Sequence, residues 1–181
     1  MDHDTFIHGK GKEFLQGKGW WGEPIHPAMV HLPTGLWFSA LVFDIISFGT
    51  GNYFVVQTAF WCLLGGCISA ILAMPFGIVD WWDIKKKKPA HRLGLLHAGI
   101  NAIAFGIFVA DMALRIANFK TLAHVTVLQL ILSIIGNIFL WTAVIIGGRM
   151  IYDQGTSVAR FSKEHWRRMA LAGGAAGAEK E

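Results

Sequence analysis

The chain has 181 residues, of which 54% are hydrophobic and only 15% are charged. Soluble domains usually carry about a quarter charged residues, so this composition argues against a soluble enzyme and indicates a membrane protein. The net charge of +4 fits basic segments lying beside anionic lipid headgroups. We therefore expect the lipid bilayer, and no nucleic acid, as a partner.

Four hydrophobic blocks follow one another along the chain, each near the roughly 20 residues that an α-helix needs to cross the hydrocarbon core. The sequence lacks the alternating segments of about ten residues that are typical of a transmembrane β-barrel. We therefore predict an all-α membrane protein whose four-helix transmembrane bundle occupies residues 25–152. The predicted spans cover residues 28–50, 54–80, 93–117 and 121–149.

Two more polar segments flank the predicted bundle. Residues 1–24 are rich in Gly and Lys and predict a flexible arm, while residues 153–181 predict an amphipathic helix and a polar tail. In that helix apolar side chains gather on one face and basic ones on the other, which is typical of a helix lying in the membrane plane. A solvated cytoplasmic helix or a docking arm for a partner is the alternative.

The distribution of Lys and Arg predicts the orientation of the bundle. With four spans, both tails and the middle loop share one side, and this side carries the run Lys85 to Lys88. The opposite side carries only Arg115 and Lys120. By the positive-inside rule, we expect both termini and the middle loop in the cytoplasm.

Histidines mark the cytoplasmic start of two spans. His26 and His31 stand at the start of the first span, and His91 and His97 at the start of the third. Ionisable groups within a span are costly, so they are candidate functional residues. Because both helices begin on the same side, we expect His31 and His97 at similar depth, each about one turn inside. The sequence thus predicts two imidazoles facing each other across the bundle.

A second polar level is expected near the opposite face. Asp44 and Asp111 each lie roughly 20 Å further across than the inner histidine of their helix. Arg115 follows Asp111 by four residues, which predicts an intrahelical ion pair, and Asp44 is expected to reach Arg115 or His124. We interpret this level as structural, with a proton or ion path as the alternative. The glycines indicate close packing and give no sign of an internal repeat.

The run from His26 to Pro33 has the form His-Pro-x-x-Val-His-x-Pro. It resembles the signature of a family of small four-helix prokaryotic membrane proteins catalogued as a domain of unknown function. Other residues of the chain look like further parts of the same pattern: Asp44, Gly77, Asp80, Trp81, His97 and Asn101. The resemblance implies a prokaryotic inner membrane. Some members are joined to Rieske iron–sulfur domains, which implies a redox setting by association, although this sequence has no Rieske motif.

The first functional hypothesis is a small redox subunit that binds one b-type haem between the first and third helices. Haem iron accepts two histidine ligands, and His31 and His97 are the predicted pair. Arg92 and Arg149 are expected near the haem propionates. Electrons would pass to or from quinone or a partner subunit.

The hydrogen-bonding groups near the ligands complete this hypothesis. Asp80 or Asn101 is expected to accept the second ring N–H of a ligand and so to fix its tautomer.

Two alternatives use the same residues differently. In one, a transition-metal ion is bound without porphyrin by three or four of His26, His31, His91 and His97, with Asp80. In the other, the chain is an accessory subunit of a respiratory or photosynthetic complex, or a homo-oligomer, and its histidines only satisfy hydrogen bonds. No catalytic motif is recognisable, so we expect no enzymatic activity from the chain alone.

Overall fold

The computed structural model describes residues 25–119 and 124–156. These residues form helices and no strand. The first span consists of α2 (Ile25–Met29) and α3 (His31–Thr50), and three long helices follow it: α4 (Tyr53–Trp82), α5 (Pro89–Ala117) and α6 (Val127–Tyr152). Within residues 25–119 and 124–156, four segments are long and apolar enough to cross a membrane, which confirms the predicted all-α membrane fold.

The fourth span begins later than predicted, at Val127 instead of residue 121. Thr126 explains this start, because its hydroxyl oxygen accepts a hydrogen bond from the Gln129 backbone N–H at 3.3 Å. Gln129 Oε1 in turn accepts from the Thr126 backbone N–H at 2.9 Å, completing a capping box. The predicted arm at residues 1–24 and the predicted amphipathic helix near residues 157–171 lie outside the described residues.

A turn at Val30 separates α2 from α3 within the first span. Pro33 explains the break, because a proline has no backbone N–H to donate to the carbonyl of Met29. The Val30 carbonyl accepts from the Thr34 backbone N–H at 3.2 Å and from the Thr34 hydroxyl at 2.7 Å. α2 is therefore a separate short helix, packed mainly against α4.

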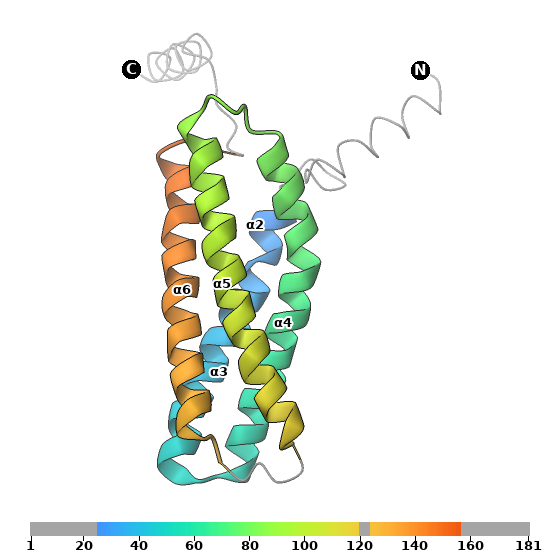
Figure 1. Cartoon of the computed structure of the whole chain (residues 1–181), viewed down its shortest axis with the longest axis vertical. Helices are drawn as coiled ribbons and strands as arrows, with labels where there is room; N and C mark the ends of the chain where they lie inside the picture. Colours follow the sequence, from blue (N-terminus) through green and yellow to red (C-terminus); the bar gives the residue numbers. More distant parts are fainter. Residues whose placement is uncertain (1–24, 120–123, 157–181) are drawn as a thin grey trace, which may run out of the picture.

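The long helices form two hairpins, α3 with α4 and α5 with α6, each joined at the lower end of Figure 1. Each helix packs most closely on the other helix of its hairpin, and weaker contacts join α3 to α6 and α4 to α5. α3 and α5 therefore lie diagonally across the bundle. The loop between the hairpins holds Lys85 to Lys88 and defines the basic end of the molecule; the other end is called the distal end.

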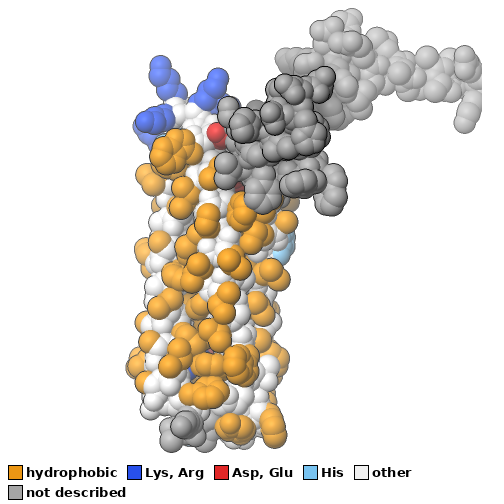
Figure 2. Space-filling view, turned by 90° about the vertical axis from the view of Figure 1, so that its right-hand side faces the viewer, with side chains coloured by type: hydrophobic (Ala, Val, Ile, Leu, Met, Phe, Trp, Pro, Cys, Tyr) orange, Lys and Arg blue, Asp and Glu red, His pale blue; other side chains and the backbone are white. Residues whose placement is uncertain are grey.

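The buried core lies where the two hairpins meet. Trp37 and Phe108 stack there, with ring centroids 4.3 Å apart and an interplanar angle of 18°, and Leu63 and Leu140 pack in the same cluster. The outer surface is apolar too: hydrophobic side chains cover the length of the helices in Figure 2, and Lys and Arg gather at one end. This outer surface is suited to contact with lipid.

Candidate functional site

His26 and His97 have the same kind of hydrogen-bonding partner, because each ring bonds to the backbone carbonyl of an alanine in its own hairpin. Nδ1 of His26 lies 3.2 Å from the carbonyl oxygen of Ala73 on α4, and Nδ1 of His97 lies 2.8 Å from that of Ala143 on α6. A carbonyl oxygen can only accept, so Nδ1 carries a proton in both rings. In the neutral form, each imidazole therefore presents an unprotonated Nε2.

A glycine beside each imidazole makes the close approach possible. A Cβ atom on Gly77 would lie 2.7 Å from Cε1 of His26, and one on Gly147 would lie 3.0 Å from Cε1 of His97. Both glycines come about one turn after the alanine whose carbonyl binds the ring. A backbone carbonyl and a glycine thus fix the position and the tautomer of each ring.

The two histidines also share the inward side of their spans. About five helical turns separate His26 from Asp44 and His97 from Arg115, so each histidine lies on the same side as its charged residue. Asp44 and Arg115 bond to each other across the bundle, with 2.7 Å between Oδ2 and Nη2.

Asn101 bonds the remaining nitrogen of His97. Its Nδ2 lies 3.0 Å from Nε2 of His97 and 2.9 Å from the His97 carbonyl oxygen. The His97 carbonyl oxygen needs a hydrogen-bond donor, so the atom of the Asn101 amide beside it is the nitrogen Nδ2 and not the oxygen. The same Nδ2 donates to Nε2 of His97, which is therefore the acceptor. The predicted role of Asp80 or Asn101 is therefore wrong for His97: a backbone carbonyl accepts its ring N–H, and Asn101 donates to the other nitrogen.

His31 does not face His97, which corrects the predicted ligand pair. The His31 side chain is exposed, and its Nδ1 lies 3.2 Å from the carbonyl oxygen of Ala28 in the preceding turn. Depth along the helix alone predicts His31 as the partner, but depth does not fix the direction of the side chain. Five residues rotate it by roughly 140° from His26, so the two side chains leave the first span on different sides.

His91 is likewise engaged elsewhere. Its ring packs against Trp81 with centroids 4.6 Å apart, and Trp81 Nε1 donates to the His91 carbonyl oxygen at 3.0 Å. Within the described ranges, no group of three or more His, Cys, Asp or Glu side chains is placed to hold a metal ion. The metal-site hypothesis, with His26, His31, His91, His97 and Asp80 as ligands, is therefore not supported.

The other predicted site residues lie around the pair at the basic end. Asp80 is half-buried on α4, about one turn beyond Gly77. Arg92 and Arg149 are exposed, and Arg149 Nε lies 3.5 Å from Oδ2 of Asp153. These two guanidinium groups are available to an anionic group that emerges at this end.

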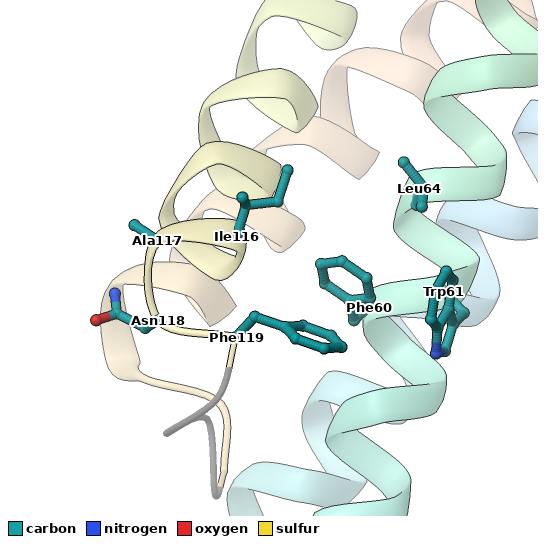
Figure 3. Close-up of a pocket in the computed structure, with 7 residues that line it drawn as sticks. All are labelled: Phe60, Trp61, Leu64, Ile116, Ala117, Asn118 and Phe119. Atoms are coloured by element: carbon teal, nitrogen blue, oxygen red, sulfur yellow. The ribbon is translucent and has the colours of Figure 1, made fainter.

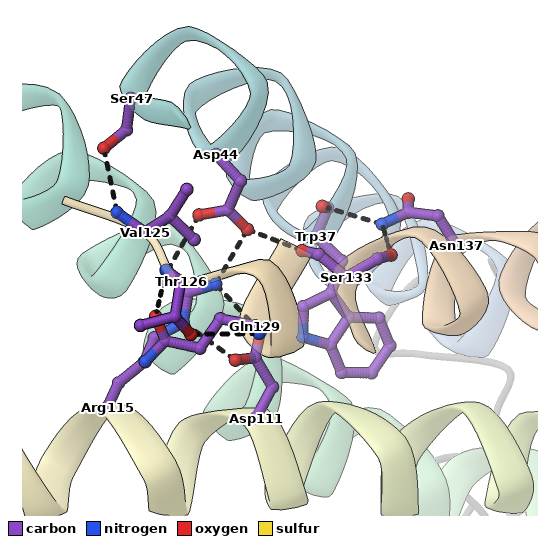
Figure 4. A network of polar contacts seen from close by, with 10 residues as sticks. All are labelled: Trp37, Asp44, Ser47, Asp111, Arg115, Val125, Thr126, Gln129, Ser133 and Asn137. Carbon is purple, nitrogen blue, oxygen red and sulfur yellow. Dashed lines mark hydrogen bonds and ion pairs between the residues drawn. The ribbon is translucent and has the colours of Figure 1, made fainter. Parts of the chain in front are cut away.

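The second polar level is a closed network near the distal end (Figure 4). Arg115 donates to both oxygens of Asp44, at 2.8 and 2.7 Å, and to both oxygens of Asp111, at 3.1 and 2.9 Å. Ser133 Oγ donates to Asp44 Oδ2 at 2.7 Å. The predicted ion pair of Arg115 with Asp111 is confirmed, and of the two partners considered for Asp44 the structure shows Arg115. The network ties α3, α5 and α6 together.

An apolar cleft of about 580 Å³ opens between α4 and the end of α5, also near the distal end (Figure 3). Its lining residues are mostly aromatic or aliphatic: Phe60, Trp61, Leu64, Ile116, Ala117, Asn118 and Phe119. Among the described residues no charged side chain lines the cleft, and the cleft lies at the opposite end of the bundle from the paired histidines. The cleft is therefore not part of the histidine site.

Comparison with protein families places the chain beside a family of membrane proteins. The model of a family described as "Predicted membrane protein (DUF2231)" matches residues 22–160, which include all four membrane-spanning segments. No match was found among curated proteins or among solved structures.

Proposed function

The chain belongs to the DUF2231 family of predicted membrane proteins, and from its own site we propose that it is a small membrane-embedded haem protein. In this proposal His26 and His97 are the axial ligands of one b-type haem at the basic end. Bis-histidine ligation of this kind is typical of electron-transfer haems. The proposed role is therefore electron transfer, and the exchange partner is quinone or another subunit.

One observation carries the proposal: two imidazoles come from diagonally opposed elements, and each is held through Nδ1 by a carbonyl oxygen. A hydrogen bond from the non-ligating ring nitrogen is what normally fixes the tautomer and orientation of a ligating histidine. With the proton held on Nδ1, the lone pair of Nε2 would be available to a haem iron. The paired geometry thus supports His26 in place of His31 as the partner of His97.

Haem binding requires two local changes. The hydrogen bond from Asn101 to Nε2 of His97 must give way to iron, since one lone pair serves only one partner. α2 must also move relative to α5 to admit the macrocycle, and the break at Val30 is a natural hinge. Arg92 and Arg149 would then lie on the side where haem propionates emerge.

The charge distribution extends the proposal to location. The basic loop supports cytoplasmic termini, and the four apolar helices support a position within a membrane. The resemblance of the run from His26 to Pro33 to a prokaryotic family is what favours the inner membrane of a prokaryotic cell. The haem would then lie near the cytoplasmic side of the bilayer.

Titration of the purified full-length chain with haemin in detergent micelles tests this proposal. We expect saturation at about one haem per chain, and a sharp α band after reduction with dithionite, as for low-spin bis-imidazole haem. Micelles without protein are the control. Absorption that rises with haemin as it does in empty micelles would contradict the proposal.

A second candidate is an accessory subunit that packs against other membrane helices. It is favoured by exposed small residues along one face of α5, namely Gly99, Ala102, Gly106, Ala110 and Ala113. A Cβ on Gly99 or Gly106 would meet no atom within 4 Å, so another helix can approach closely. Failure of the haemin titration would favour this candidate.

A further inference from the structure

The two hairpins carry matching residues at matching places. His26, Trp37 and Asp44 of the first hairpin correspond to His97, Phe108 and Arg115 of the second, each pair being separated by the same 71 residues. The match includes the bonding: both histidines donate through Nδ1 to an alanine carbonyl of the returning helix.

The returning helices α4 and α6 match in the same way, at a spacing one residue shorter. Four identical pairs of α4 and α6 lie at this spacing: Gly66 and Gly136, Ile68 and Ile138, Ala73 and Ala143, and Gly77 and Gly147. A Cβ on Gly66 would lie 2.5 Å from Cδ1 of Trp37, and one on Gly136 would lie 2.7 Å from Cε1 of Phe108. Each hairpin therefore packs its central aromatic ring on its own glycine.

Burial follows the same correspondence. Every buried residue of α6 corresponds to a buried residue of α4 at this spacing. The pairs, with the α4 residue first, are Ala59 and Gln129, Leu63 and Ser133, Gly66 and Gly136, Cys67 and Asn137, Ala70 and Leu140, and Ala73 and Ala143. The agreement extends to positions where the side chains differ in chemistry, so it reflects position in the fold.

Corresponding residues of the two hairpins also touch each other. Trp37 stacks on Phe108, and Asp44 bonds to Arg115. A residue contacts its own counterpart only at a two-fold axis. The packing agrees, because α3 lies against α4 and α6 as α5 lies against α6 and α4. A pseudo-two-fold axis thus runs along the bundle between α3 and α5.

We infer that the domain is a duplicated helical hairpin. We also infer that the opposite charges of Asp44 and Arg115 allow a first hairpin to pack on a second hairpin but not on another copy of itself. Two first hairpins would bring two Asp44 carboxylates together at the axis, and two second hairpins would bring two Arg115 guanidinium groups together. Buried like charges are strongly unfavourable. The partner that fits the first hairpin is therefore the second one. This inference rests on the contacts of the bundle and is independent of haem.

An exchange of side chains between corresponding positions tests the inference in the full-length chain. The pair exchange Asp44→Arg with Arg115→Asp places the new carboxylate beside Asp111, four residues away on the same helix. The complete exchange moves the neighbours as well: it adds Ala40→Asp, Asp111→Ala, Leu63→Ser and Ser133→Leu. Duplication predicts that the complete exchange rebuilds the network on the other side of the axis.

Thermal unfolding and size-exclusion chromatography in the same detergent compare the two variants. We expect the complete exchange to melt higher than the pair exchange, with the elution volume of the wild type. Equal or lower stability of the complete exchange would overturn the inference. Should the six-residue variant fail to fold at all, the exchange Trp37→Phe with Phe108→Trp decides, since duplication predicts that it is more stable than either single change.

Discussion

Arg115 bonds two carboxylates at once, and all three side chains are fully buried. The arginine neutralises only one of the two negative charges, so its removal would leave both carboxylates without their main donor. Arg115→Met is expected to reduce the free energy of unfolding by about 3–5 kcal/mol, the range for breaking a buried ion pair. Denaturant titration in detergent micelles measures the change.

Arg149→Met is the matched control for this substitution. Arg149 also has an acidic partner four residues away, but its side chain is 64% exposed. Exposed pairs contribute less than about 1 kcal/mol. Equal losses in the two variants would contradict a central stabilising role for the Arg115 network.

The histidines illustrate which residue properties a single sequence reveals. Their number, their position near span ends and the presence of a pair all follow from the sequence, and so does the pairing of Arg115. The proposed pairing of His26 with His97 does not follow from the sequence, because depth along the helix favours His31. The face of the helix favours His26. The rings are held by the backbone carbonyls of Ala73 and Ala143, and such contacts cannot be recognised from the side chains in a sequence.

Helix α4 and helix α6 each bring a glycine against an imidazole. Gly77→Ala and Gly147→Ala place a methyl group within 3.0 Å of His26 and His97, respectively. Each substitution is expected to displace the ring and to weaken haem binding by about 10- to 100-fold, as loss of ligand support usually does. Haemin titration of the two variants checks this expectation.

Gly106→Ala provides the control for the glycine substitutions. A Cβ there meets nothing within 4 Å, and alanine has the higher helix propensity. Its haem affinity should therefore equal that of the wild type. If all three variants weakened binding alike, a general effect on the helices would explain the result better than displacement of the imidazoles.

Element type and number were predictable here, whereas some element ends were not. Hydrophobic length alone defines four spans, since crossing the bilayer demands it. The start of α6 depends on a side-chain bond between Thr126 and Gln129, and the break at Val30 depends on Pro33. Such local bonds move a helix end by several residues without changing the hydrophobic pattern.

The molecule as a whole is expected to have its basic end in the cytoplasm. Two single-cysteine variants test this, Lys86→Cys at the basic end and Asn118→Cys at the distal end, both in a chain in which Cys62 and Cys67 are replaced by Ala. A membrane-impermeant maleimide added to intact cells should label residue 118 and not residue 86. The reverse labelling pattern would contradict the positive-inside assignment.

The duplication could not be seen in the sequence alone. The glycines give no sign of a repeat in the sequence, because the glycines that match, such as Gly77 and Gly147, are few and lie among unmatched ones. Corresponding positions with different side chains obscure the duplication further, since Asp44 and Arg115 carry opposite charges. In three dimensions the shared contacts reveal the correspondence.

His26 and His97 are proposed to ligate one haem together across the two halves of the bundle. The most direct test is the dithionite-reduced absorption spectrum of the haemin-loaded wild type beside the His26→Ala, His97→Ala and His31→Ala variants. We predict that the low-spin α band is lost in the first two variants and retained in His31→Ala. Loss of the band in His31→Ala with retention in His26→Ala would contradict this proposal.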